Sequence, residues 1–161
     1  MLKFKVFGFD VTIEMTFLFI LLLFSSHYLS SSQPYAFFEQ SLILFLSILI
    51  HELGHAFAYR KYKVHTEIKL HGMGGVCIPL TARGLLHKES VIVSLAGPFA
   101  MFALAAIYYG LDRVFAFPDS FLRAENRTDM IYFINIGWGL FNLMPIYPLD
   151  GGQAFRSFLK A

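Results

Sequence analysis

Two histidines and a glutamate stand together in the segment His51-Glu-Leu-Gly-His55. Residues four apart lie on one face of an α-helix, so both imidazoles can reach a single metal ion. Glu52 lies beside them and can take the proton of a water bound to that metal. This pattern is typical of zinc metalloproteases. The sequence therefore predicts a hydrolytic metal site on a helix.

The residues before this motif, 40–50, have the composition of a membrane span. Ionisable side chains inside a bilayer are rare, because each costs roughly 2.5–3.5 kcal/mol on insertion scales. Three such groups in one apolar segment therefore indicate a function at membrane depth.

A catalytic zinc usually has three protein ligands and one open position. His51 and His55 would supply two, and the third has to come from another part of the chain. Its candidates are the carboxylates and four further histidines, namely His27, His65, His71 and His87. Asp150 stands out among them, because Pro145 and Pro148 break regular helix just before it. Irregular backbone at membrane depth is tolerated where it lines a buried cavity, which suits a metal site.

The composition is that of an integral membrane protein. Of the 161 residues, 57% are hydrophobic and 15% are charged, whereas a soluble domain is about a quarter charged. The net charge of +2 is too small to favour a nucleic-acid partner. The single cysteine, Cys77, excludes an internal disulfide and a cysteine-rich metal site, and we expect it to be a small apolar residue in a strand.

We expect one membrane-embedded domain over residues 1–161. Its predicted fold is an all-α multi-pass bundle of about four transmembrane helices, with short β-strands at the cytoplasmic face. Alternating residues predict N-terminal strands within 3–14 and a β-hairpin over 64–80, with glycines at its turn or against another backbone. The four predicted spans cover about 15–29, 37–62, 90–115 and 129–143.

The basic residues predict the orientation of these spans. With a cytoplasmic N-terminus, ten lysines and arginines fall on the cytoplasmic side and three on the opposite side. The second and fourth spans then both end at the cytoplasmic face, so Asp150 and His55 lie at a similar depth. We therefore expect an active site near the cytoplasmic side of the bilayer.

At this point the residues resemble the site-2 protease family of intramembrane zinc metalloproteases. His51-Glu-Leu-Gly-His55 is similar to the metal motif of that family. The segment Asn142-Leu-Met-Pro-Ile-Tyr-Pro-Leu-Asp150-Gly is similar to its second motif. Ser94-Leu-Ala-Gly-Pro98 and the glycines at 72–75 match two weaker features. The order and spacing of these motifs fit along nearly the whole chain.

The resemblance implies one zinc ion per chain on His51, His55 and Asp150, with no other cofactor. It implies that Glu52 is the general base, and that Asn142 holds the substrate or the oxyanion. The implied partners are the lipid bilayer and a membrane protein cleaved in or near its transmembrane segment, with the hairpin edge binding it as an added strand. Members often carry further spans that gate substrate entry, so a gating or regulatory partner is also expected.

Two other functional classes compete with a protease. A zinc-binding membrane scaffold or chaperone would bind metal without cleavage and would have no use for Glu52. A metal transporter would place ionisable residues along several spans, whereas here they converge on one point. Both comparisons favour the protease.

Overall fold

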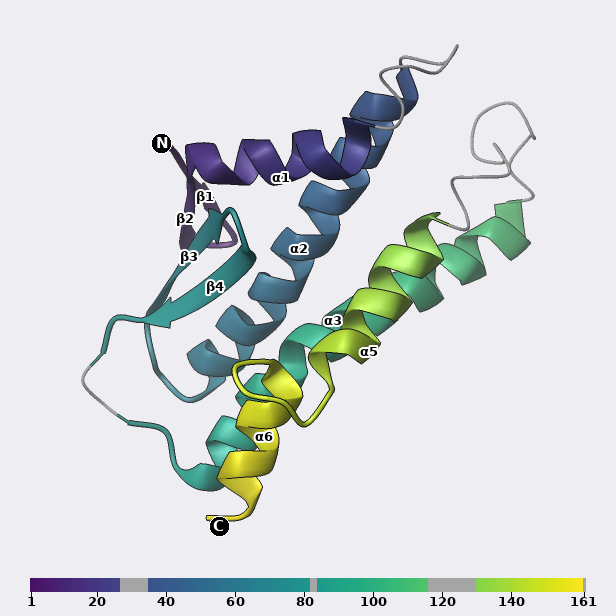
Figure 1. Ribbon diagram of the computed structural model, residues 1–161. Coiled ribbons are helices and arrows are strands. Elements are labelled where there is room, and N and C mark those ends of the chain that lie inside the picture. The colour runs from purple at the N-terminus through teal and green to yellow at the C-terminus, as the bar shows by residue number, and fades with distance from the viewer. Residues whose placement is uncertain (27–34, 82–83, 116–129, 161) are drawn as a thin grey trace.

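The computed structural model describes residues 1–26, 35–81, 84–115 and 130–160. Figure 1 shows its helices and a small sheet, and residues 130–142 are helical throughout. The helices are α1 (Met15–Ser25), α2 (Tyr35–Lys61), α3 (His87–Phe115), the π-helical turn η2 (Phe133–Gly137), α5 (Trp138–Asn142) and α6 (Asp150–Phe158). The fold is mostly helical, as predicted.

Four strands form one sheet in the order β1-β2-β3-β4. They are β1 (Leu2–Val6), β2 (Phe9–Ile13), β3 (Thr66–His71) and β4 (Gly74–Pro79). Both predicted strand regions are present as antiparallel hairpins, and a parallel β2–β3 pair joins them. Parallel strands require a long crossover, which α1 and α2 provide here. The sequence did not predict that the two hairpins share a sheet.

The core lies where the inner face of the sheet meets α1 and α2. Val11 on β2 and Ile68 and Leu70 on β3 are completely buried, and so is Phe17 on α1. Ile48 on α2 joins the same hydrophobic cluster. Side chains two apart on a strand share a face, so β3 presents alternate residues to the helices. This packing holds α2 against the sheet by the face that is opposite α3 (Figure 1).

A glycine brings α2 and α3 into close contact. A Cβ atom at Gly54 would lie 2.5 Å from the carbonyl oxygen of Ala96 and 2.9 Å from Cβ of Ala100. Real Cβ atoms do not approach other atoms so closely, so a larger residue would push the helices apart. Gly54 is the fourth residue of the histidine motif, and it therefore places both histidines directly beside α3.

Two helices are long and apolar enough to cross a membrane, Tyr35–Lys61 and His87–Leu111. They agree with the second and third predicted spans. The predicted first span corresponds to α1, which has 11 residues, and the end of that span lies outside the described residues. The predicted fourth span corresponds to the helical residues 130–142. The count of four spans is therefore not confirmed.

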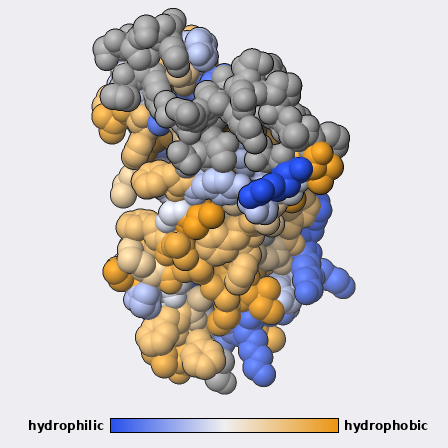
Figure 2. Space-filling model, turned by 90° about the vertical axis from the view of Figure 1, so that its right-hand side faces the viewer, coloured by the Kyte–Doolittle hydropathy of each residue, from blue (hydrophilic) through white to orange (hydrophobic). Residues whose placement is uncertain are grey.

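Large apolar side chains cover much of the surface. The face in Figure 2 is mostly hydrophobic below the undescribed residues. Phe99 and Ile107 on α3 are 58% and 60% exposed, and Phe133 on η2 is 80% exposed. Such contiguous apolar surface is unfavourable in water and is typical of a protein covered by lipid.

Candidate metal centre and catalytic cavity

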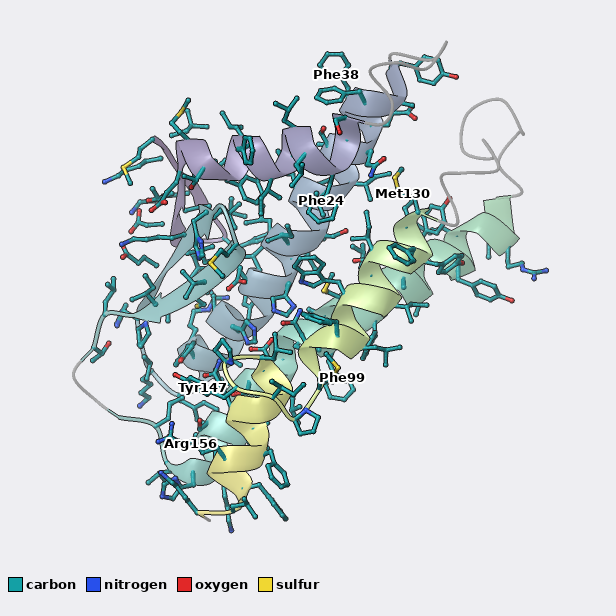
Figure 3. All side chains as sticks on the ribbon, viewed as in Figure 1. Phe24, Phe38, Phe99, Met130, Tyr147 and Arg156 are labelled. Atoms are coloured by element: carbon teal, nitrogen blue, oxygen red, sulfur yellow. The ribbon has the colours of Figure 1, made fainter. Side chains whose placement is uncertain are left out.

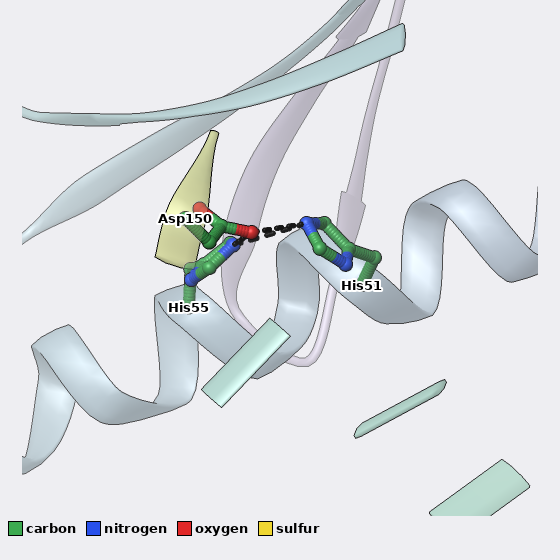
Figure 4. Close-up of side chains that lie close together, drawn as sticks. All are labelled: His51, His55 and Asp150. Carbon is green, nitrogen blue, oxygen red and sulfur yellow. Dashed lines mark hydrogen bonds and ion pairs between the residues drawn. The ribbon is translucent and has the colours of Figure 1, made fainter. Parts of the chain in front are cut away.

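Two imidazoles and a carboxylate meet at one point (Figure 4). Nε2 of His51 lies 3.0 Å from Oδ2 of Asp150, and Nε2 of His55 lies 3.3 Å from the same oxygen. The two Nε2 atoms are 3.1 Å apart. Among the described residues, these three form the group whose ligand atoms lie within 4.8 Å of one another. The histidines come from adjacent turns of α2, as their spacing predicts.

Asp150 is brought to the histidines by the turn that joins α5 to α6. A hydrogen bond of 2.9 Å from the backbone N–H of Leu149 to the carbonyl of Ile146 closes this turn. Asp150 is the first residue of α6, and Gly151 and Gly152 follow it. A Cβ atom on either glycine would overlap the backbone of the turn. The two glycines therefore let α6 begin against the turn, with Asp150 aimed at α2.

The imidazole of His55 is oriented by α3. Its Nδ1 atom lies 2.7 Å from the carbonyl oxygen of Val93, so Nδ1 carries the hydrogen and donates it. Nε2 then faces His51 and Asp150. A metal-binding histidine commonly has such a second hydrogen bond, which fixes the tautomer and the ring orientation. Nδ1 of His51 is buried and has no hydrogen bond in the described part of the chain.

The donor set fits a zinc ion. Oδ2 of Asp150 is buried and has no hydrogen bond of acceptable geometry among the described residues, although both imidazoles lie beside it. Nε2 of His51, Nε2 of His55 and Oδ2 of Asp150 thus converge on a common centre. Two imidazoles and one carboxylate are a known catalytic zinc set that leaves a coordination position open. A cation at this centre would satisfy the converging atoms.

Glu52 is held against the edge of the sheet. Its side chain is 4% exposed, and it lies on α2 next to His51. A Cβ atom at Gly75 on β4 would lie 2.5 Å from Oε1 of Glu52 and closer still to its Cγ atom. The carboxylate is therefore packed directly on the backbone of β4. The sequence placed Gly75 at a turn or against another backbone, whereas its neighbour is this carboxylate.

Gly97 on α3 forms the opposite wall of the metal centre. A Cβ atom there would overlap Nε2 of His55 and lie 2.8 Å from Cε1 of His51. The sequence analysis placed Gly97 in a weaker family feature and did not predict its contact with both imidazoles. Several glycines near the motifs were the available signal of close packing there. The sequence did not indicate which residues these glycines would contact.

The metal centre opens into a cavity of about 420 Å³. Its walls come from α2, α3, β4, the end of α5 and the start of α6. The lining residues are His51, Glu52, His55, Tyr59, His71, Met73, Gly75, Val76, Cys77, Val93, Ser94, Asn142, Pro148, Leu149, Asp150 and Gln153. Figure 3 shows Tyr147 beside the start of α6, at the side of this region. The cavity has room for a short extended peptide segment next to the converging ligands.

Asn142 lines the same cavity, as its expected contact with a substrate requires. Its Nδ2 atom donates a 3.0 Å hydrogen bond to the carbonyl of Trp138, one turn earlier in α5. One of its two N–H groups is thus already used by its own helix. The remaining N–H can still face a ligand.

The other candidate histidines that the structure describes do not join the metal group. His71 lines the cavity, and its Nδ1 atom accepts a 3.3 Å hydrogen bond from the backbone N–H of Met73. His65 and His87 are absent from the cavity lining among the described residues. His27 lies outside the described residues.

Cys77 lies on β4 and borders the cavity. Burial raises the pKa of its thiol to about 12, so the thiol stays neutral at ordinary pH. Zinc binds the thiolate rather than the thiol. Cys77 therefore acts as a small neutral side chain in a strand, in agreement with its expected role.

Comparisons with known proteins identify relatives of the chain. The model of Peptidase family M50 matches residues 119–161, which include the segment that carries Asp150. The chain is 29% identical over 160 residues to the zinc metalloprotease MJ0392 of Methanocaldococcus jannaschii, covering 98% of this chain and 44% of that protein. It is 33% identical over 129 residues to Rip3 of Mycobacterium tuberculosis, covering 74% of this chain and 30% of Rip3. The chain thus spans less than half the length of these relatives.

A solved structure has the same fold along nearly the whole chain. The site-2 protease from Methanocaldococcus jannaschii matches with a TM-score of 0.72 and 26% sequence identity. The match covers 99% of this chain and 71% of the solved chain. Members of this family are integral membrane proteins, which agrees with the two long apolar helices. Together with the motifs, these findings confirm that the chain belongs to the site-2 protease family of M50 peptidases.

Proposed function

We propose that this chain is an intramembrane zinc metalloprotease that hydrolyses a peptide bond in or near the transmembrane segment of a membrane protein. The observation that carries the proposal is the convergence of His51, His55 and Asp150 beside Glu52 in one cavity. The family membership supports it, and so do the names of the relatives as zinc metalloproteases.

One zinc ion per chain would be held by His51, His55 and Asp150. When bound there, zinc would polarise the scissile carbonyl and lower the pKa of a bound water to about 7. Glu52 would accept a proton from the attacking water and then give it to the leaving amine. The position of its carboxylate, beside the histidines and against β4, supports this role. Asn142 would contact the substrate or the oxyanion through its remaining N–H.

The substrate would lie in extended form along β4. This strand is an edge of the sheet, and Gly75, Val76 and Cys77 on it border the cavity. Edge strands offer unpaired backbone groups to an added strand. Pairing there would bring a peptide bond of an unwound substrate next to Glu52. A helix must unwind in this way before a protease can reach its backbone.

We also propose the orientation in the membrane. Arg60 and Lys61 lie in the last turn of α2, and Arg156 lies in the last turn of α6. Both helix ends point to the same side of the molecule, the lower side of Figure 1. An excess of basic residues favours the cytoplasmic side. The metal centre would then lie near the cytoplasmic side, with the N-terminus in the cytoplasm.

Paired cleavage assays test the proposal. The wild-type chain and Glu52→Gln are purified, loaded with zinc and mixed in liposomes with a panel of single-span substrates. We expect cleavage by the wild-type chain alone, with about one zinc per chain in both proteins and loss of cleavage on chelation. Glu39→Gln, near the start of α2 and absent from the cavity lining among the described residues, provides the matched control and should cleave normally.

A non-proteolytic zinc-binding scaffold is the competing reading. It predicts zinc in both proteins and no cleavage of any substrate by either. A preparation that binds no zinc after reloading would instead contradict the assignment of His51, His55 and Asp150 as ligands.

A further inference from the structure

Tyr59 continues the line of the two metal-site histidines. His51, His55 and Tyr59 are spaced four apart on α2, so all three share one face of the helix. Tyr59 is partly buried and lines the catalytic cavity together with the histidines. The sequence analysis assigned it no role.

The backbone at Tyr59 is well fixed. Its carbonyl oxygen accepts hydrogen bonds from the N–H groups of Tyr62 (2.9 Å) and Val64 (3.1 Å), which close the end of α2. The side chain of Tyr59 lines the cavity from this position, and Cys77 on β4 and Gln153 on α6 line it too.

The polar groups that share this cavity are mostly committed to internal hydrogen bonds. His55 donates to Val93, Asn142 donates to Trp138 at 3.0 Å, and Gln153 donates to Pro148 at 3.0 Å. Among the residues that the structure describes, the hydroxyl of Tyr59 makes no hydrogen bond to another side chain or to the backbone. Its O–H is available to a ligand in the cavity.

We propose that Tyr59 donates a hydrogen bond to the scissile carbonyl oxygen as that oxygen gains negative charge. When water attacks the carbonyl carbon, the C=O π electrons move onto the oxygen, and Tyr59 stabilises the resulting oxyanion without transferring its proton. When the C–N bond breaks, its electron pair goes to nitrogen, which takes the proton held by Glu52. Asn142 has one N–H left for the same oxygen, so the two residues can act together.

A phenol suits this role because its O–H is a hydrogen-bond donor that can rotate toward the oxygen. A hydrogen bond to an ionised acceptor is roughly twice as strong as a hydrogen bond to a neutral acceptor. The gain then appears in the transition state rather than in substrate binding. The inference rests on the proposed protease function.

The test compares Tyr59→Phe with Tyr62→Phe in the zinc-loaded chain. Each change removes one hydroxyl, at Tyr59 on α2 or at Tyr62 directly after α2. Tyr62 does not line the cavity among the described residues. We expect Tyr59→Phe to lower kcat roughly 100-fold, the usual effect of losing one oxyanion donor, with KM and zinc content unchanged. Tyr62→Phe should match the wild-type chain.

A binding measurement gives a second readout that needs no turnover. A phosphinic peptide, whose tetrahedral centre carries an anionic oxygen, should bind Tyr59→Phe at least tenfold more weakly than it binds the wild-type chain. The parent peptide should bind equally to Glu52→Gln with and without Tyr59→Phe. Together these results would place the Tyr59 interaction in the tetrahedral state.

Several outcomes would overturn the inference. An unchanged kcat in Tyr59→Phe would exclude a donor role, and a raised KM alone would make Tyr59 a contact for the ground state. Loss of zinc would make it a positioning residue for the metal. If the wild-type chain cleaves no substrate, both the proposed function and the Tyr59 inference fail. If the wild-type chain and Tyr59→Phe are equally active, only the Tyr59 inference fails.

Discussion

The metal centre contains buried polar atoms without a hydrogen bond. Oδ2 of Asp150 has no hydrogen bond of acceptable geometry among the described residues, and neither has Nδ1 of His51. Buried polar atoms of this kind cost free energy unless something satisfies them. The site is therefore arranged for a cation, and its residues can be tested one by one.

Asp150→Ala should remove one of the three ligands. Loss of a group that merely orients a ligand costs 10- to 100-fold in metal affinity, so loss of a direct ligand should cost about 100-fold or more. Competition with a zinc chelator measures this affinity. Asp10→Ala is the control, because Asp10 is an exposed partner of Lys5 far from the cavity lining. Equal zinc affinity in both variants would contradict the role of Asp150.

Gly97→Ala should disturb the metal centre although it removes no ligand. The new methyl group would overlap Nε2 of His55, so the ring must turn away from Asp150. We expect zinc affinity to fall by about 10- to 100-fold, as for other changes that misorient a ligand. Gly110→Ala, also on α3, meets nothing within 4 Å and should bind zinc normally. Normal zinc binding by both variants would show that α3 can shift enough to accommodate a methyl group at position 97.

The candidate site could be predicted in part. The spacing of His51 and His55, and the helix-breaking residues before Asp150, identified residues that the structure brings together. Whether they bind zinc stays a prediction. The contacts of Gly97 and Gly75 with the functional side chains could not be predicted, because a glycine carries no side-chain signal and its neighbours depend on how α2, α3 and β4 pack.

At the scale of elements, α2 is the helix that connects the sheet to α3. It packs against the sheet on one side and against α3 on the other, and it carries both histidines and Glu52.

The bounds of α2 were predicted within two residues at the start and one at the end, since a long apolar run followed by basic residues is a strong signal. The joining of the two hairpins into one sheet depends on pairing across α1 and α2, which local patterns do not encode.

Gly54→Val should loosen the contact between α2 and α3. Its Cβ would lie 2.5 Å from a carbonyl oxygen of Ala96, and overpacking of this kind usually costs about 1–3 kcal/mol. We expect a lower midpoint in thermal unfolding in detergent, together with weaker zinc binding. Gly137→Val is the control, because a Cβ at Gly137 meets nothing within 4 Å. A shared loss of stability would indicate a general effect of valine in these helices.

At the scale of the whole molecule, two cavities adjoin α5, which contributes Asn142 to one and Trp138 and Phe141 to the other. One is the catalytic cavity. The other has about 480 Å³ and is almost entirely apolar. It is lined by Phe24, Gln40, Leu44, Met130, Phe133, Ile134, Gly137, Trp138 and Phe141. Figure 3 labels Phe24 and Met130 at its upper end. The organisation of residues 1–161 as one domain stays a prediction.

The proposed orientation can be tested by labelling. In a Cys77→Ser background, a cysteine at Arg156 should react with a membrane-impermeant maleimide from the cytoplasmic side alone, because Arg156 is exposed at the end of α6. Inverted and right-side-out vesicles present the two sides separately. A cysteine at Ile107, on the apolar surface of α3, serves as a control that should react from neither side. Labelling of position 156 from outside would reverse the proposed topology.

The ligands of the metal centre come from distant parts of the chain. A zinc ion on His51, His55 and Asp150 would cross-link α2 to α6 and so close a loop that contains β3, β4, α3 and α5. Such a closure removes conformational entropy from the unfolded chain, as a disulfide does. Metal loading would therefore have to follow the synthesis and docking of α6, because Asp150 is the first residue of that helix. Until then the metal centre would lack its third ligand.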